Sequence, residues 1–222
     1  MNLLKKKRIK IIFDLDNTIY RESDYLYWLI VEFATLHRLN VPQFINPSYI
    51  ENNLNRRKID LLTNLFYLAF QRYPSPEEHN EIFSLYYNLN CNISPYDGIK
   101  ELLFFLKDKT CLMLISNGVQ CVQENKIKLL RIREFFDDIL ILEDKKNQKP
   151  SIQNIKSYMN FSKEIIVIGD DPRTDILFGK NLGAMTIRLK KGFFKLENST
   201  ADYEVNEPTE IIDILSRRYC NE

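Results

Sequence analysis

Five short, mostly apolar runs recur along the chain, each bounded by polar or turn-forming residues. They are Ile9–Phe13, Cys111–Ile115, Ile139–Leu142, Ile165–Ile168 and Met185–Leu189. Runs of this length are typical of buried strands in a parallel sheet. The stretches between them space apolar residues as amphipathic helices do, at Gly98–Lys107, Val119–Leu130, Ile152–Met159 and Asp175–Leu182. Alternating strands and helices predict an α/β fold with a doubly wound parallel sheet.

The region between the first two runs breaks this alternation. Tyr25–Leu39, Pro47–Tyr73 and Pro76–Asn90 all have helical spacing and many aromatic residues. Turn-prone residues from Ser94 to Gly98 follow them. We therefore expect a Rossmann-like core formed by residues 1–19 and 96–222, with an inserted helical cap formed by residues 20–95.

The composition limits the kinds of partner. With 45% hydrophobic and 27% charged residues the chain is globular, and its net charge of +1 gives no reason to expect a nucleic acid polymer as partner. No apolar stretch approaches the roughly 18 residues of a membrane span, and the run near the N-terminus is shorter than the roughly 7 to 15 residues of a signal peptide. We expect a cytoplasmic protein with no membrane partner. The four cysteines, which lack paired metal-type spacing, should be free thiols: Cys91, Cys111, Cys121 and Cys220.

Two carboxylates follow the first predicted strand. Asp14 and Asp16, in the string Phe-Asp-Leu-Asp-Asn-Thr, are two residues apart and so point to the same side of an extended chain. Parallel sheets bind ligands beyond the carboxyl ends of their strands. Such a pair can hold a hard divalent cation, while one carboxylate attacks phosphorus and the other transfers a proton. A simple Asx turn explains the same string, so other motifs have to decide.

Two further strand ends carry polar groups suited to a phosphate. Ser116, at the end of the second run, can donate its hydroxyl to a phosphoryl oxygen, and the backbone N–H groups of Asn117 and Gly118 would favour the same anion at a helix start. A plain helix N-cap explains these residues equally well. Lys149, before Pro150, could neutralise the nucleophile and the transferring group, although most lysines are simply solvated.

The fourth run ends in Gly169 and is followed by three acids. Asp170, Asp171 and Asp175 would repel one another unless a cation compensates them, which favours a metal site. The competing interpretation is that Asp171 or Thr174 only caps the helix that follows.

In this order and at these separations, the four motifs resemble the signature of the haloacid dehalogenase superfamily. The resemblance spans nearly the whole chain, and the helical insert resembles the cap of its phosphoglycolate phosphatase and pyrimidine nucleotidase-like members. It implies a catalytic nucleophile, Asp14, and a general acid/base, Asp16. It implies Mg²⁺ as cofactor, bound by Asp14, the backbone carbonyl of Asp16, and Asp170, with Asp175 holding a metal-bound water. The phosphate contacts would come from Thr18, Ser116, Asn117 and Lys149.

The function expected from the resemblance is a phosphatase acting on a small phosphate monoester, a sugar phosphate or nucleoside monophosphate, through an aspartyl phosphate. An acid at the position of Asp16 argues against a dehalogenase, whose halide leaving group takes no proton. A phosphomutase keeps the same acids and is the main alternative, and an inactive scaffold on the same fold is a further one. The cap residues Arg21, Arg56 and Arg57 are candidates for contacting the substrate body. The particular ester, the oligomeric state and any role of Asp171 stay open.

Overall fold

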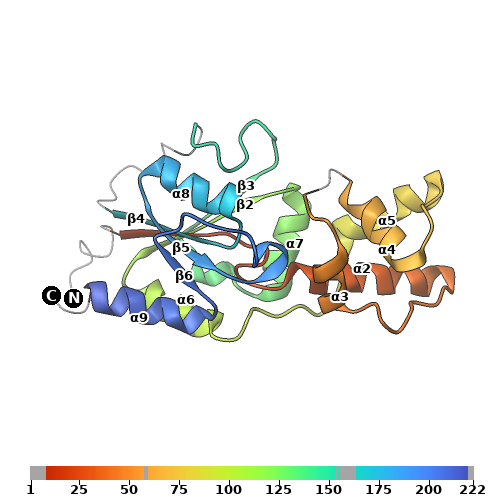
Figure 1. Ribbon diagram of the computed structural model, residues 1–222, viewed down its shortest axis with the longest axis horizontal. Coiled ribbons are helices and arrows are strands. Elements are labelled where there is room, and N and C mark those ends of the chain that lie inside the picture. The colour runs from red at the N-terminus through yellow and green to blue at the C-terminus, as the bar shows by residue number, and fades with distance from the viewer. Residues whose placement is uncertain (1–8, 58–59, 154, 156–163, 220–222) are drawn as a thin grey trace.

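The computed structural model describes residues 9–57, 60–153, 155 and 164–219. In this part of the chain, six parallel strands form one sheet in the order β3-β2-β1-β4-β5-β6 (Figure 1). The strands are β1 (Ile9–Phe13), β2 (Cys111–Asn117), β3 (Asp138–Leu142), β4 (Glu164–Gly169), β5 (Met185–Leu189) and β6 (Tyr203–Val205). The reversal of strand order beside β1 confirms the predicted doubly wound α/β fold.

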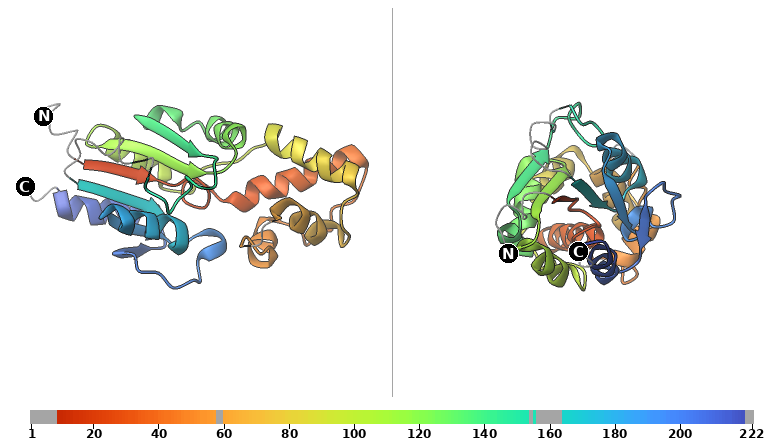
Figure 2. Two further views of the ribbon diagram at one scale, coloured as in Figure 1. Left: turned by 90° about the horizontal axis from the view of Figure 1, so that it is seen from above. Right: turned by 90° about the vertical axis from the view of Figure 1, so that its left-hand side faces the viewer.

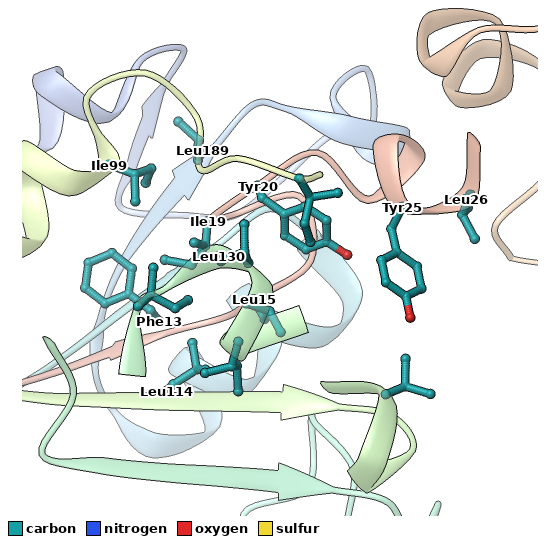
Figure 3. Close-up of a cluster of buried hydrophobic side chains, with 14 of the residues drawn as sticks. Phe13, Leu15, Ile19, Tyr20, Tyr25, Leu26, Ile99, Leu114, Leu130 and Leu189 are labelled. Carbon is teal, nitrogen blue, oxygen red and sulfur yellow. The ribbon is translucent and has the colours of Figure 1, made fainter. Parts of the chain in front are cut away.

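Helices cover both faces of the sheet. On one face, α6 (Ile99–Lys107), α7 (Gln120–Leu130) and α9 (Pro208–Tyr219) pack on alternate strand residues such as Phe13 and Leu114 (Figure 3). On the other face, α8 (Leu177–Leu182) packs through Phe178 against a smaller cluster that contains Ile12 and Met113. Because both faces are covered, the strands are apolar along their length, which is why they read as continuous runs.

A helical cap lies at one end of the core, beyond the carboxyl ends of the strands (Figures 1 and 2). It contains α2 (Glu22–His37), α3 (Pro47–Asn53), α4 (Leu61–Phe70) and α5 (Pro76–Asn88). The two chain crossings lie side by side, since the Tyr96 N–H donates to the Ile19 carbonyl at 2.8 Å and Tyr20 pairs with Pro95. We propose residues 20–95 as the bounds of the cap on this basis.

Local signals explain where the cap helices begin. Ser75 and Glu78 form a reciprocal capping box at the start of α5, with Pro76 in its first turn. Asn46 accepts a hydrogen bond from the Tyr49 N–H at the start of α3. These cap helices are therefore bounded by their own sequence, and α2 packs on α4 through the buried rings of Phe33 and Phe66.

Three expectations differ from the structure. The prediction of one helical stretch over Pro47–Tyr73 is wrong, because α3 ends at Asn53 and α4 begins at Leu61, where Asp60 caps it. The strand β6 and the helix α9 were not predicted. For β6 the reason is its length, since three residues give too short a pattern for a strand. The helix expected from Asp175 begins instead with a π-helical turn, η3 (Pro172–Ile176).

Three further expectations concern a helix, the cysteines and membrane spans. The helix expected over Ile152–Met159 falls mostly on residues 154 and 156–163, which are outside the described residues. Cys91, Cys111 and Cys121 are free thiols, as expected, and Cys220 is outside the described residues. Among the described residues, none of the helices has the length and apolar character to cross a membrane.

Candidate active site

The ends of three neighbouring strands converge on one cavity. Asp14 follows β1, Ser116 and Asn117 end β2, and Asp170 follows β4, so the order of the sheet brings the predicted motifs together. The cavity has a volume of about 340 Å³ and opens between the core and the cap. The core residues that line it are Asp14, Asp16, Asn17, Ser116, Asn117, Gly118, Gln148, Lys149, Asp170, Asp171, Thr174, Asp175 and Phe194, and the cap contributes Glu22, Arg56 and Arg57.

Lys149 lies between two carboxylates at the floor of this cavity. Its Nζ donates to Asp14 Oδ1 at 2.5 Å and to Asp175 Oδ1 at 2.6 Å, and all three side chains are largely buried. Burial alone would lower the pKa of Lys149, but the two carboxylates outweigh it and raise the pKa, so the ammonium stays charged. The floor thus carries a fixed cation within contact of Asp14.

Asp14, Asp170 and Asp175 form a cluster that lacks enough positive charge. One carboxylate oxygen from each lies within 4.8 Å of the others. Burial, followed by the nearby Asp175, raises the pKa of Asp14 to about 8 despite Lys149, and burial and the neighbouring acids also raise the pKa of Asp170. Such shifts express the cost of burying several carboxylates together without a second cation.

These carboxylates fit a divalent metal ion. Within the described residues, Asp170 Oδ2 is buried and has no hydrogen-bond partner. Both oxygens of Asp175 are already used, since Oδ1 accepts from Lys149 and Oδ2 accepts from the Asp171 N–H at 3.1 Å. Hard cations such as Mg²⁺ bind through one or two carboxylates. The free oxygen therefore belongs to Asp170, while Asp175 has the contacts of a supporting residue.

Asp16 lies outside that carboxylate cluster and has its own set of donors. Its Oδ1 accepts from the Tyr20 hydroxyl at 2.6 Å and from Lys126 Nζ at 2.8 Å, and its Oδ2 accepts from Gln123 Nε2 at 2.8 Å. Burial alone would raise the pKa of Asp16, but the Lys126 charge and the three hydrogen bonds lower it. The two carboxylates at the end of β1 thus have pKa values shifted in opposite directions, that of Asp14 upward and that of Asp16 downward.

Sequence reasoning did not find Lys126 or Gln123. Both lie on α7, on the same buried stripe as Val122, Ile127 and Leu130. A lysine or glutamine on an apolar stripe requires a buried polar partner, and this was the available signal. The partner of both side chains is Asp16, which lies more than one hundred residues away in the sequence.

The two motif residues at the end of β2 have different contacts. Ser116 Oγ accepts from Gln123 Nε2 at 2.6 Å, so its own hydroxyl proton can be donated into the cavity. The Asn117 side chain instead makes two hydrogen bonds with the backbone of Lys149, at 2.8 and 3.2 Å, and so positions that lysine. The expectation for the Gly118 N–H was wrong, because it donates to the Leu142 carbonyl at the end of the sheet.

The remaining core residues divide into lining and supporting positions. Thr18 is buried but is not among the residues that line the cavity. Asp171 accepts from the Arg173 N–H, in agreement with a capping role. At Gly169, an added Cβ would lie 2.3 Å from Asp175 Cβ, so glycine gives Asp175 its room. Arg188, fully buried on β5, donates from Nε to the Asp170 carbonyl at 3.0 Å and holds this acidic loop in place.

On the cap side of the cavity, each arginine is paired with a carboxylate. Arg56 donates from Nε to both oxygens of Glu22, at 3.1 and 3.2 Å. Arg57 makes a bidentate pair with Asp171, both bonds at 2.7 Å, and also contacts Glu197. The third candidate, Arg21, pairs with Glu51 at 3.1 Å and does not line the cavity.

Residues 11–189 match the family model for haloacid dehalogenase-like hydrolases. The chain belongs to this family, and the predicted class of hydrolase is confirmed. It is 28% identical over 224 residues to the glyceraldehyde 3-phosphate phosphatase of Methanocaldococcus jannaschii, covering 92% of this chain and 96% of that protein. It is 23% identical to the pyrophosphatase PpaX of Bacillus mycoides, covering 93% and 96%. Its fold is similar to that of the HAD-hydrolase YfnB from Bacillus subtilis bound to magnesium, with a TM-score of 0.71 and 19% identity over 94% of this chain and 99% of that one.

Proposed function

We propose that this enzyme is a magnesium-dependent phosphatase that hydrolyses a small phosphate monoester through a phosphorylated Asp14. The observation that carries the proposal is the floor of the cavity, where Lys149 contacts Asp14 and Asp175 beside the unpartnered Asp170 oxygen. A buried carboxylate next to a fixed ammonium and a free metal-binding oxygen suits an attack on a phosphoryl group.

The metal would be held by Asp14, Asp170 and the backbone carbonyl of Asp16, with Asp175 behind them. When bound, Mg²⁺ supplies positive charge to the phosphoryl oxygens and to the buried carboxylates. The Lys149 ammonium and the Ser116 hydroxyl, which both line the cavity, would bind the remaining phosphoryl oxygens. The structure of YfnB, described as bound to magnesium, supports this choice of ion.

Two half-reactions follow from the two carboxylates. Asp14 forms a bond to phosphorus while the ester P–O bond breaks, and Asp16 donates a proton to the leaving oxygen. Water then attacks the phosphorus of the acyl phosphate, Asp16 takes a proton from that water, and Asp14 is released with inorganic phosphate. The donors around Asp16 favour its carboxylate form, which suits the second half-reaction. For the first, Asp16 has to carry a proton and turn from Lys126 toward the leaving oxygen.

The size of the cavity supports a small substrate. A volume of about 340 Å³ suits a phosphate ester of a few carbon atoms or a small sugar phosphate. The relatives named for glyceraldehyde 3-phosphate and for pyrophosphate also point to small soluble compounds. The cap lies across the cavity and can exclude water while Asp14 is phosphorylated.

Phosphate release from p-nitrophenyl phosphate tests the proposal. The purified wild-type protein should release inorganic phosphate in Mg²⁺ and lose this activity in EDTA. A phosphomutase would move the phosphoryl group between positions of a sugar phosphate with little release, and an inactive scaffold would release none. Metal-independent release, or no release at all, would contradict the proposed function.

A further inference from the structure

The roof of the cavity, formed by the cap side chains Glu22, Arg56 and Arg57, has its positive charges already neutralised. Glu22 is 2% exposed and holds Arg56 through both of its carboxylate oxygens. Arg56 therefore presents to the cavity as half of an ion pair rather than as a free cation.

The second roof arginine, Arg57, has more carboxylate partners than Arg56. Arg57 makes two hydrogen bonds with Asp171 and two with Glu197, so two carboxylates face one guanidinium. The Phe194 ring lies against the guanidinium, 3.7 Å from ring centroid to Cζ. With carboxylates along its edge and an aromatic ring on one face, Arg57 has little capacity left to bind an anion.

The other charged residues that line the cavity add no free cation to this roof. Six carboxylates line the cavity against three cations, Lys149, Arg56 and Arg57. Lys149 is committed to the floor, where the transferred phosphoryl group would bind. Lys126, which pairs with Asp16 at 2.8 Å, and a divalent ion at the floor would together offset the excess of carboxylates. The phosphoryl end of a substrate thus meets a cation, whereas its other end meets arginines that are already paired with carboxylates.

We propose that the substrate is a phosphate ester whose remaining part is uncharged, a polyol, aldehyde or sugar. Glu22 and Glu197 are specificity-determining residues that select against esters carrying a carboxylate or a second phosphate. This inference rests on the proposed function and adds the class of leaving group to it. An anionic leaving group would be desolvated with no free cation to receive it, and an uncompensated charge of this kind is an effective source of specificity.

Two matched pairs of substrates test the proposal. Glycerol 3-phosphate and 3-phosphoglycerate have the same number of carbon atoms and differ in a hydroxymethyl group against a carboxylate, as do 2-hydroxyethyl phosphate and 2-phosphoglycolate. The wild type should have a kcat/KM at least about tenfold higher for the uncharged member of each pair, and inorganic pyrophosphate should be a poor substrate. Equal or better hydrolysis of the anionic members would overturn the inference.

Charge-removing variants locate the effect. Glu22→Gln should raise the ratio of the anionic to the uncharged kcat/KM about tenfold, because Arg56 loses its partner and becomes available to the substrate carboxylate. Adding Arg56→Met to this variant should abolish the gain. Glu197→Gln, at a side chain 30% exposed, should fold without difficulty and raise the ratio by a smaller factor, since Asp171 still holds Arg57.

The control is Glu81→Gln, which removes an exposed cap carboxylate paired with His37 at 2.8 Å and should leave the ratio unchanged. If the ratio is the same in Glu22→Gln, in Glu197→Gln and in this control, the roles of Glu22 and Glu197 are refuted. Failure of the wild type to hydrolyse p-nitrophenyl phosphate in Mg²⁺ would refute the proposed function and this inference together. Hydrolysis of p-nitrophenyl phosphate without the preference for uncharged esters would refute the inference alone.

Discussion

The floor and the roof of the cavity differ in how far their charged groups are paired. At the floor, Lys149 contacts Asp14 and Asp175, and the neighbouring Asp170 keeps an unpartnered oxygen. At the roof, Arg56 and Arg57 are each matched by at least one carboxylate. The floor therefore lacks a second cation, whereas each arginine of the roof already has a carboxylate partner.

This difference separates chemistry from selection. Buried groups that are left without charge compensation are typical of catalytic sites, where the missing partner is a metal ion or the transition state. Charged groups that are already paired gain little binding energy from an added ligand. Their main effect is to weaken the binding of unsuitable compounds, which gives specificity. The core should thus determine the rate of phosphoryl transfer, and the cap should determine which ester is accepted.

The largest effect is expected at the floor, from Asp14→Asn. The amide is a poor nucleophile, so turnover of p-nitrophenyl phosphate should fall at least about a thousandfold. The fold should be retained, because the substitution removes an ionisable group from a cluster of acids whose burial and mutual repulsion raise the pKa of Asp14. Circular dichroism and a phosphate-release assay check both points, and activity above that level would exclude Asp14 as the nucleophile.

The next effect concerns the metal. Asp170→Ala removes the carboxylate with the unpartnered oxygen, and the Mg²⁺ concentration needed for half-maximal rate should rise about ten- to a hundredfold. Part of the rate should return at high Mg²⁺. Asp171→Asn is the matched neighbour and should leave this concentration nearly unchanged. An unaltered Mg²⁺ dependence in Asp170→Ala would refute its assignment.

A further effect tests the residues that position Asp16. Lys126→Met removes the ammonium 2.8 Å from Asp16 Oδ1, which should lower kcat about tenfold or more with little change in KM, because proton transfer is disturbed and binding is not. Lys128→Met on the exposed side of the same helix is the control. A change confined to KM, or equal effects of the two variants, would contradict a positioning role.

The last effect concerns folding and not turnover, and is a dependence of stability on pH in the metal-free protein. The pKa of Asp14 is raised to about 8 from an ordinary value of 3.8, so the folded state binds a proton that the unfolded chain releases. Stability from this group is present below about pH 4 and is lost as pH rises toward 8, by at most about 1.4 kcal/mol per pH unit. Urea unfolding in EDTA at pH 5, 6.5 and 8 should show this decline, and Asp14→Asn should reduce it. A free energy of unfolding that rises over the same interval would have the wrong sign.

The sequence predicted the fold and the floor better than the roof, for physical reasons. Strands buried on both faces need apolar runs, and the residues after them converge because parallel strands end at one edge. The positions of Asp14, Lys149 and Asp170 could therefore be anticipated. The contacts of Asp16 with Lys126 and of Arg57 with Asp171 could not, because Lys126 lies within the helix α7 and Arg57 in a cap loop, and neither follows the end of a strand.

The most direct test of the account is to trap the phosphoryl group during turnover. The wild-type protein is mixed with p-nitrophenyl phosphate and Mg²⁺, quenched in acid and reduced with borohydride, which converts an aspartyl phosphate to homoserine. Peptide mass spectrometry should locate the converted residue at position 14, with Asp16, Asp170 and Asp175 unchanged and no conversion in Asp14→Asn. Conversion at another carboxylate, or steady release of phosphate by the Asp14→Asn variant, would contradict the central claim that Asp14 carries the phosphoryl group.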